Sequence, residues 1–176
     1  MIKGGFKGKI LRVNLSTEEM KTEELREDWA KKFIGGRGYG TRIIIEEIDP
    51  KIDPLSEENK VVIATGPLDG TLAPSSGRTM VITKGALNGA IACSNAGGYF
   101  GPALKHAGFD MVIIEGKAKE PVYLWIYKGE AELKCAKDVW GKLADEADKI
   151  LREKTHPKAE TMEIGPAGEK QSLVAN

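Results

Sequence analysis

The chain has 176 residues, enough for one domain whose core buries about two-thirds of its unfolded surface. Its 26 basic and 26 acidic residues cancel, which excludes the electrostatic footprint of a nucleic-acid-binding protein or of a protein drawn to an anionic membrane. The charged fraction of 30% is rich in Lys and Glu, a composition that suits surface ion pairs in a thermophilic protein.

Targeting and metal signals are absent from the sequence. No apolar run approaches the roughly 18 residues that span a bilayer, and the first residues lack a signal-peptide core, so we expect a soluble, cytoplasmic protein. The two cysteines, Cys93 and Cys135, are too few for a disulfide framework and too far apart for a C-x-x-C pair. With His106 and His156 as the only histidines, the chain offers no self-contained zinc or iron–sulfur site.

The first part of the chain predicts a hairpin, two helices and three strands. Apolar and polar residues alternate before the turn at 16–19, and Asp28 is expected to cap the first helix, which Gly35-Gly36 interrupts before the second. Short apolar runs follow and predict buried strands. The expected strands cover residues 6–15, 20–25, 61–64, 79–83 and 90–93, and the expected helices cover 29–34 and 39–48.

The second part predicts a helix over 99–107, a strand over 111–115 and a hairpin that turns at Lys128-Gly129. An amphipathic helix over 139–154, with Trp140 and Leu143 on its apolar face, and a strand over 160–164 complete it.

The order helix, apolar strand, Gly-Pro occurs at 39–67 and again at 139–166, which indicates an internal duplication. We therefore expect one α+β domain over residues 1–176, with two related halves of short antiparallel or mixed sheets and helices. The second half is expected to be cut short, leaving a sheet edge or apolar patch through which the chain forms a homo-oligomer or binds a missing part.

A candidate phosphate site follows from two segments. Arg78 ends the run Ser75-Ser76-Gly77-Arg78, and seventeen residues later Asn95 opens a glycine turn, Asn95-Ala96-Gly97-Gly98, before a predicted helix. Small residues leave backbone N–H groups open, a helix start adds free donors, and an arginine fork fits phosphate. These residues predict a cradle for a phosphate-bearing cofactor. Tyr99 and Phe100 are interpreted as core residues of the helix, with contact to a cofactor ring as the alternative.

Several motifs in order resemble the N-terminal domain of tungsten-containing aldehyde:ferredoxin oxidoreductases. They are Phe33-Ile34-Gly35-Gly36-Arg37-Gly38, Thr65-Gly66-Pro67-Leu68-Asp69-Gly70, Ala73-Pro74-Ser75-Ser76-Gly77-Arg78, Ser94-Asn95-Ala96-Gly97-Gly98-Tyr99-Phe100-Gly101 and Gly165-Pro166-Ala167-Gly168-Glu169. The resemblance extends over nearly the whole chain.

The resemblance implies a tungsten bis-pterin cofactor, oxidation of aldehydes to carboxylic acids, and electron transfer through a [4Fe–4S] cluster to ferredoxin. It implies that Arg78 binds a pterin phosphate. It also implies that Asn95 and Gly97 bind the cofactor and the magnesium that bridges its phosphates, with Ala96 and Gly98 as neighbours; Asn95 is the candidate magnesium ligand.

The resemblance covers the pterin base alone. The family's cluster cysteines, second pterin half-site and acid/base residues have no counterpart in this chain, so we expect the chain alone to be inactive and to need the remaining domains or a partner subunit. A non-catalytic cofactor-binding or assembly module with the same fold is the alternative.

Two other functional classes are disfavoured. A dinucleotide loop at Gly36-Arg37-Gly38-Tyr39-Gly40 would need glycine where Thr41 stands, and it follows a predicted helix instead of a strand. A hydrolase with Ser75 or Ser94 as nucleophile lacks the G-x-S-x-G elbow.

Overall fold

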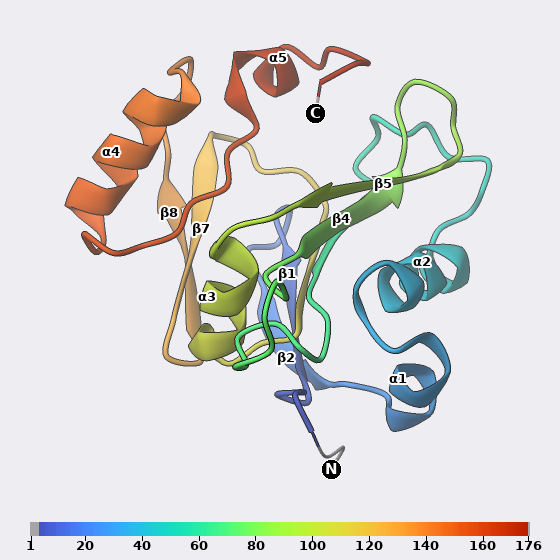
Figure 1. Cartoon of the computed structure of the whole chain (residues 1–176). Coiled ribbons are helices and arrows are strands. Elements are labelled where there is room, and N and C mark those ends of the chain that lie inside the picture. The colour runs from blue at the N-terminus through green and yellow to red at the C-terminus, as the bar shows by residue number, and fades with distance from the viewer. Residues whose placement is uncertain (1–3, 176) are drawn as a thin grey trace.

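The computed structural model describes residues 4–175 as an α+β arrangement around a six-stranded sheet (Figure 1). The strands lie in the order β2-β1-β6-β3-β4-β5, and β1 and β6 run parallel while every other neighbouring pair is antiparallel. The strands are β1 (Lys9–Asn14), β2 (Met20–Glu24), β3 (Lys60–Ala64), β4 (Thr79–Lys84), β5 (Ile91–Ala96) and β6 (Met111–Glu115). The expected α+β class with mixed sheets is confirmed.

Helices cover one face of this sheet. The pair α1 (Glu27–Phe33) and α2 (Gly36–Glu47) packs there, and its buried side chains form one apolar cluster with those of the sheet, including Trp29, Tyr39, Ile43, Val62 and Ile82. Because side chains alternate along a strand, the neighbouring residues of the same strands point the other way, as Ile10 does relative to Leu11.

The opposite face is covered by α3 (Phe100–Ala107) and by a separate hairpin, β7 (Val122–Tyr127) and β8 (Glu130–Cys135). Leu104 and Phe109 join Leu124 and Leu133 in the second apolar cluster. The hairpin turns at Lys128 and Gly129, both with positive φ, as a type I′ turn requires. Two further helices, α4 (Ala144–Lys154) and α5 (Gly165–Glu169), lie outermost (Figure 1).

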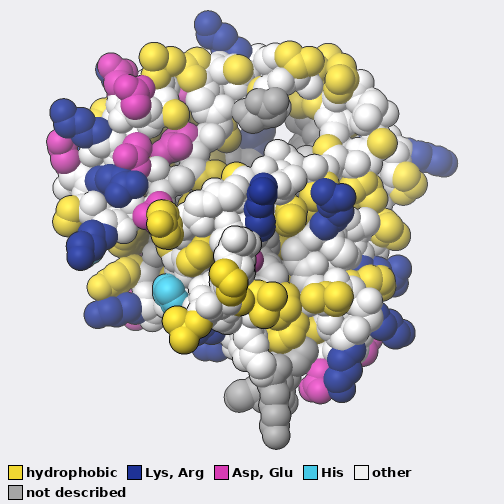
Figure 2. Space-filling model, viewed as in Figure 1, with side chains coloured by type: hydrophobic (Ala, Val, Ile, Leu, Met, Phe, Trp, Pro, Cys, Tyr) yellow, Lys and Arg dark blue, Asp and Glu magenta, His cyan; other side chains and the backbone are white. Residues whose placement is uncertain are grey.

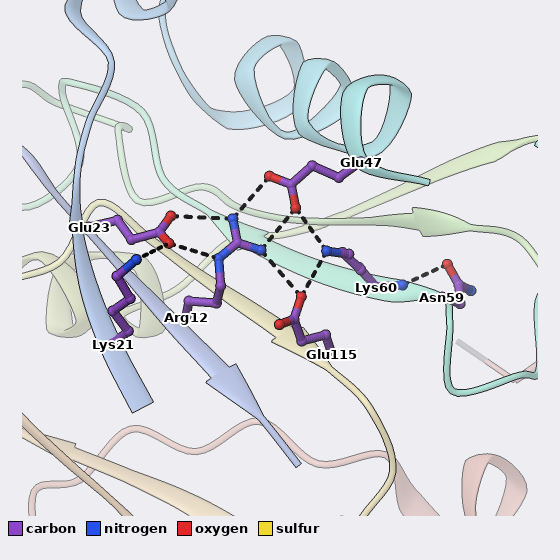
Figure 3. A network of polar contacts seen from close by, with 7 residues as sticks. All are labelled: Arg12, Lys21, Glu23, Glu47, Asn59, Lys60 and Glu115. Atoms are coloured by element: carbon purple, nitrogen blue, oxygen red, sulfur yellow. Dashed lines mark hydrogen bonds and ion pairs between the residues drawn. The ribbon is translucent and has the colours of Figure 1, made fainter. Parts of the chain in front are cut away.

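A network of charged side chains joins five elements at one end of the sheet (Figure 3). Arg12 on β1 contacts Glu23 on β2, Glu47 on α2 and Glu115 on β6, and Lys60 on β3 contacts the same Glu47 and Glu115 at 2.9 and 2.8 Å. Burial alone would raise the pKa of Glu47 and of Glu115, but hydrogen bonds from Arg12 and Lys60 outweigh burial and lower both.

Several local predictions were wrong. The strand expected to be buried at 90–93 is β5, whose residues are exposed apart from half-buried Cys93. The last amphipathic helix starts at Ala144 instead of 139, because Gly141 takes a positive φ of 78° and its N–H donates to the Glu169 carboxylate; Trp140 and Leu143 are consequently exposed. Residues 160–164 form no strand within the described chain. The first helix begins at Glu27, so Asp28 lies inside its first turn and pairs with Arg26 instead of capping.

No helix among residues 4–175 has the length and apolar character needed to cross a membrane.

Candidate functional site

Arg78 and Asn95, seventeen residues apart in sequence, meet at the start of β4 and the end of β5. The antiparallel register sets Met80 opposite Asn95 and Thr79 opposite Ala96. Arg78 Nη1 donates a hydrogen bond of 2.7 Å to Asn95 Oδ1 on the protein surface. The fold therefore brings these two residues into direct contact. Asn95 itself lies in β5 and not in the turn, because the strand pairing continues to Ala96.

The turn after β5 presents open backbone. A Cβ built on Gly97 or on Gly98 would meet nothing within 4 Å, and Gly98 has a φ of 111°, a conformation that favours glycine. Ala96, Gly97 and Gly98 are all exposed. A ligand oxygen can therefore approach the backbone of this turn closely.

The loop that carries Arg78 touches this turn. A Cβ built on Gly77 would lie 2.5 Å from the carbonyl oxygen of Gly98, so the two backbones pack at a distance that only glycine allows. The sequence residues singled out as a cradle thus form one contiguous surface: Arg78, Asn95, Ala96, Gly97 and Gly98.

The start of α3 adds positive electrostatic potential. The first turn of α3 contains no acidic residue, and its N-cap, Tyr99, makes no side-chain capping hydrogen bond. Free N–H groups at a helix start and the helix dipole both favour a bound anion. Tyr99 is 76% exposed, so its interpretation as a core residue was wrong: the N-cap position lies outside the packed face of the helix. Phe100 is half-buried.

Surface charge around the site agrees with an anion site. Figure 2 shows basic side chains amid mainly uncharged side chains and backbone over the middle of this face, where β4, β5 and the start of α3 lie, while acidic side chains gather over α4. Hydrophobic side chains gather below this area in the same view, and Leu68 and Leu72 of the loop before Arg78 are among the exposed leucines of the chain.

Asp69 is a site residue that the sequence reasoning missed. Its side chain is buried beneath the Arg78 loop, 3% exposed, and its Oδ2 accepts the Gly66 N–H at 2.7 Å. Burial raises the pKa of Asp69, while the N–H groups of Gly66 and Arg78 and the charge of Lys105 act in the opposite direction. In the sequence Asp69 is a single acid between Gly66 and Gly70, and this position does not indicate its burial.

The candidate magnesium ligand, Asn95, offers a single side-chain oxygen, which already accepts a hydrogen bond from Arg78. Asn95 Oδ1 is an amide oxygen, a type of ligand that magnesium accepts, and a carbonyl oxygen that accepts one hydrogen bond retains a second lone pair. Among residues 4–175 no three His, Cys, Asp or Glu side chains are grouped to hold a metal. Cys93 is half-buried in β5 and Cys135 exposed at the end of β8, both as free thiols.

A hydrolase site receives no support. Ser94 is on β5 opposite Val81. His106 Nε2 contacts the carbonyl oxygen of Gly70 at 3.3 Å, and His156 Nδ1 accepts the Lys158 N–H. In the described chain neither imidazole is hydrogen-bonded to Ser75 or Ser94.

Comparison with known proteins identifies relatives over almost the whole chain. The family described as "Aldehyde ferredoxin oxidoreductase, N-terminal domain" matches residues 10–176. The chain is 53% identical over 168 residues to the tungsten-containing aldehyde ferredoxin oxidoreductase of Pyrococcus abyssi, covering 95% of this chain and 28% of that protein.

Two further similarities lie outside those enzymes. The aliphatic sulfonate oxidoreductase, WOR-like subunit, of Pyrococcus furiosus is 41% identical over 154 residues, covering 86% of this chain and 24% of that protein. The solved active site complex BamBC of benzoyl coenzyme A reductase, in complex with 1,5-dienoyl-CoA, superposes with a TM-score of 0.95 at 32% identity, covering 98% of this chain and 26% of that one. The chain spans about 28% of the length of the first curated relatives that it matches.

Proposed function

Because this chain belongs to the aldehyde ferredoxin oxidoreductase family and matches its N-terminal domain, we propose that it forms the base of a tungsten-pterin site in an enzyme that oxidises aldehydes. The net reaction converts an aldehyde and water into a carboxylic acid, two protons and two electrons, and ferredoxin accepts the electrons. The relatives' names, which include tungsten, aldehyde and ferredoxin, support this assignment.

The observation that carries the proposal is the hydrogen bond from Arg78 to Asn95 beside the open backbone of Gly97 and Gly98. In the proposed enzyme the Arg78 guanidinium binds a cofactor phosphate through its remaining N–H groups. Asn95, whose Oδ1 accepts the hydrogen bond from Arg78, orients the guanidinium and would be the residue that holds the cofactor's magnesium. The tungsten-pterin group, when bound, supplies the two-electron chemistry.

Other parts of the proposal concern what lies outside this chain. A [4Fe–4S] cluster needs four thiolates, and Cys93 and Cys135 cannot supply them, so the cluster belongs to the remaining part of the enzyme. That part and ferredoxin are the proposed partners, and association of copies of the chain is a further proposal. We also propose a cytoplasmic location and a thermophilic source. Relatives from Pyrococcus and Thermococcus support the thermophilic source.

The anion site is tested with the 176-residue chain and inorganic pyrophosphate plus magnesium, measured by isothermal titration calorimetry. Replacing a charged hydrogen-bond donor weakens binding by about 10- to 100-fold, so Arg78→Ala should lose affinity by this factor. Arg152→Ala, at a half-buried arginine paired with Asp148 on α4, is the matched control and should bind normally. Equal affinity of Arg78→Ala and the unaltered chain would contradict the proposal.

The oxidoreductase assignment is tested by expressing the chain together with the remaining part of the enzyme. Tungsten content and aldehyde-dependent reduction of ferredoxin should both appear in the assembled protein and fall in Arg78→Ala. Pyrophosphate binding by the chain, without tungsten in the assembled protein, would favour a non-catalytic cofactor-binding module instead.

A further inference from the structure

The loop of residues 66–77, called the Asp69 loop below, exposes its leucines and buries its acid. Leu72 is fully exposed and Leu68 is 59% exposed, whereas Asp69 between them is only 3% exposed. Burial of apolar side chains stabilises a fold and burial of a carboxylate opposes it. The loop therefore adopts the opposite of the arrangement that burial alone would favour, which indicates that the Asp69 carboxylate performs a specific task there.

The carboxylate lies between the loop and the first turn of α3. Its Oδ2 accepts the Gly66 N–H at 2.7 Å, while Oδ1 is buried and has no hydrogen-bond partner among residues 4–175. A Cβ built on Gly101 would lie 3.3 Å from Asp69 Oδ1 and 2.9 Å from Thr79 Oγ1. Glycine at 101 thus lets both polar side chains pack against the backbone of α3.

Charge pairing does not explain the buried acid. The nearest buried cation, Lys105, forms its ion pair with Asp110, which also accepts the N–H groups of Lys7 and Gly8. Lys105 acts on Asp69 through its charge alone, since among residues 4–175 its ion pair is with Asp110. The Asp69 carboxylate therefore accepts a hydrogen bond from the backbone and, among the described residues, takes part in no salt bridge.

Both chain neighbours of Arg78 are packed against the segment 98–101. Gly77 abuts the Gly98 carbonyl, and Thr79 lies against Gly101. Asp69 shares the space at Gly101 with Thr79 and ties the same loop to its own beginning through Gly66. The backbone at Arg78 is therefore held by packing contacts on both sides, and the Asp69 side chain occupies the space between the loop and α3.

We propose that Asp69 is a positioning residue: its buried carboxylate fixes the Asp69 loop on the first turn of α3 and so holds Arg78 beside Asn95, ready for a phosphate. The inference rests on the proposed anion site and adds the residue that preorganises it. A loop without helix or strand otherwise loses substantial conformational entropy when a ligand orders it. Because the Asp69 carboxylate already orders the loop in the free protein, ligand binding does not incur this entropy loss.

The test uses the 176-residue chain with inorganic pyrophosphate and magnesium in calorimetry. Asp69→Ala should weaken binding by about tenfold, because the loop must then be ordered on binding. Asp69→Asn should stay within about threefold of the unaltered chain, because its side-chain oxygen still accepts the Gly66 N–H. The control is Asp53→Ala, which removes an exposed carboxylate whose Oδ1 accepts the Leu55 N–H at 2.9 Å far from the site.

A double-mutant cycle separates positioning from general destabilisation. If Asp69 acts through Arg78, Asp69→Ala in the Arg78→Ala background should cause no further loss of affinity. If Asp69→Ala lowered the affinity equally in the unaltered chain and in Arg78→Ala, or did not lower it in the unaltered chain, the positioning role would be overturned. The proposed site at Arg78 would remain intact. Failure of the unaltered chain to bind pyrophosphate would instead refute the proposed function, and the role of Asp69 with it.

Asp69→Glu provides a second test of the proposal in case Asp69→Ala does not fold. The longer side chain keeps the charge but moves the carboxylate in a packed space, so its affinity should fall as in Asp69→Ala while Asp69→Asn binds normally. Hydrogen exchange at the amides of residues 66–78 should accelerate in Asp69→Glu and stay slow in Asp69→Asn. Normal affinity and exchange in Asp69→Glu would overturn the proposal.

Discussion

Gly97, in the turn before α3, and Gly101, in the first turn of α3, have opposite environments. Gly101 is crowded, since an added Cβ would lie 2.9 Å from Thr79 Oγ1 and 3.3 Å from Asp69 Oδ1. We predict that Gly101→Ala lowers the free energy of unfolding by about 1–3 kcal/mol through overpacking at this buried position. Urea denaturation measures the change, and an unchanged midpoint would show that the neighbouring side chains can move aside at no cost.

Gly97 gives the complementary prediction, in which binding changes and stability does not. A Cβ there meets nothing within 4 Å, so Gly97→Ala should alter the free energy of unfolding by less than about 0.5 kcal/mol. If phosphate approaches the bare backbone, the added methyl group should still reduce pyrophosphate affinity. Calorimetry and urea denaturation of the same variant test both halves, and normal affinity would place the phosphate elsewhere.

At the residue scale the sequence singled out Arg78 and Asn95, which meet in the structure, and gave no indication that Asp69 is buried beside them. The first two belong to motifs whose chemistry, an arginine fork and an amide near a glycine turn, is visible in a linear sequence. Burial of Asp69 depends on α3 folding back onto the loop from thirty residues away, through Gly101. A single acid in a glycine-containing loop carries no sign of that contact.

At the scale of elements, the approach of α2 to the sheet depends on Gly40. A Cβ built there would lie 2.6 Å from Ile82 Cδ1 and 3.4 Å from Val62 Cγ1. Alanine favours a helix over glycine by about 1 kcal/mol, but overpacking a core costs about 1–3 kcal/mol. Since Ile82 and Val62 are fully buried, we predict that the clash outweighs the propensity and that Gly40→Ala lowers the melting temperature.

A second substitution makes the prediction for Gly40 sharper. Ile82→Val removes Cδ1, the atom nearest to the added methyl group, so Gly40→Ala should cost less in that background than in the unaltered chain. Ile45→Ala on the exposed side of the same helix is the control for a change in α2 away from the sheet. Additive effects of the two core substitutions would show that the cost does not arise from this contact.

Element types were predictable where the pattern was long or the turn was specific. The two hairpins, the strands β3, β4 and β5 and the helix before Gly108 all appear, although β5 is exposed and not buried as expected, and the Lys128-Gly129 turn has the backbone that its sequence indicates. The errors in element type and length lie around 139–164, where Gly141 breaks the helix and residues 160–164 stay unpaired within the described residues. Periodicity cannot report whether a partner strand is present.

At the scale of the whole molecule, the expected duplication is met only in part: a helix precedes Gly-Pro in both segments, but the second segment lacks the expected strand in the described residues. α2 and β3 lie before Gly66-Pro67, whereas α4 is followed by residues 160–164, which form no strand, and Ile164 has helical backbone angles. The segment before Gly66-Pro67 contributes β1, β2 and β3 to the central sheet, and the hairpin β7–β8 covers the face opposite α1 and α2. The candidate site lies at the end of β5, an edge strand of that sheet.

The network around Arg12 joins β1, β2, β3, β6 and α2 and predicts how the molecule responds to acid. Arg12 is about one-fifth exposed and meets three carboxylates, so Arg12→Met removes one of the two cations that these partly buried carboxylates contact and leaves each with a single lysine partner. We predict a loss of about 2 kcal/mol in the free energy of unfolding at neutral pH, between the values for surface and buried pairs. Lys31→Met, at an exposed pair with Glu27, should change it by less than about 0.5 kcal/mol.

The pH dependence follows from the lowered pKa values of Glu47 and Glu115. A carboxylate whose folded pKa lies below its unfolded value of 4.5 stabilises the fold above that pH, and the contribution is lost as pH falls through the folded pKa. In Arg12→Met the hydrogen bonds and charge of Lys60 remain, so the pKa values of Glu47 and Glu115 should rise part of the way and part of this dependence should vanish. The gap between the two proteins should therefore be largest above pH 5 and shrink toward pH 3 in urea denaturation series. A gap that is the same at pH 7 and pH 3 would mean that Arg12 stabilises the sheet by packing its aliphatic stem and not through its charge.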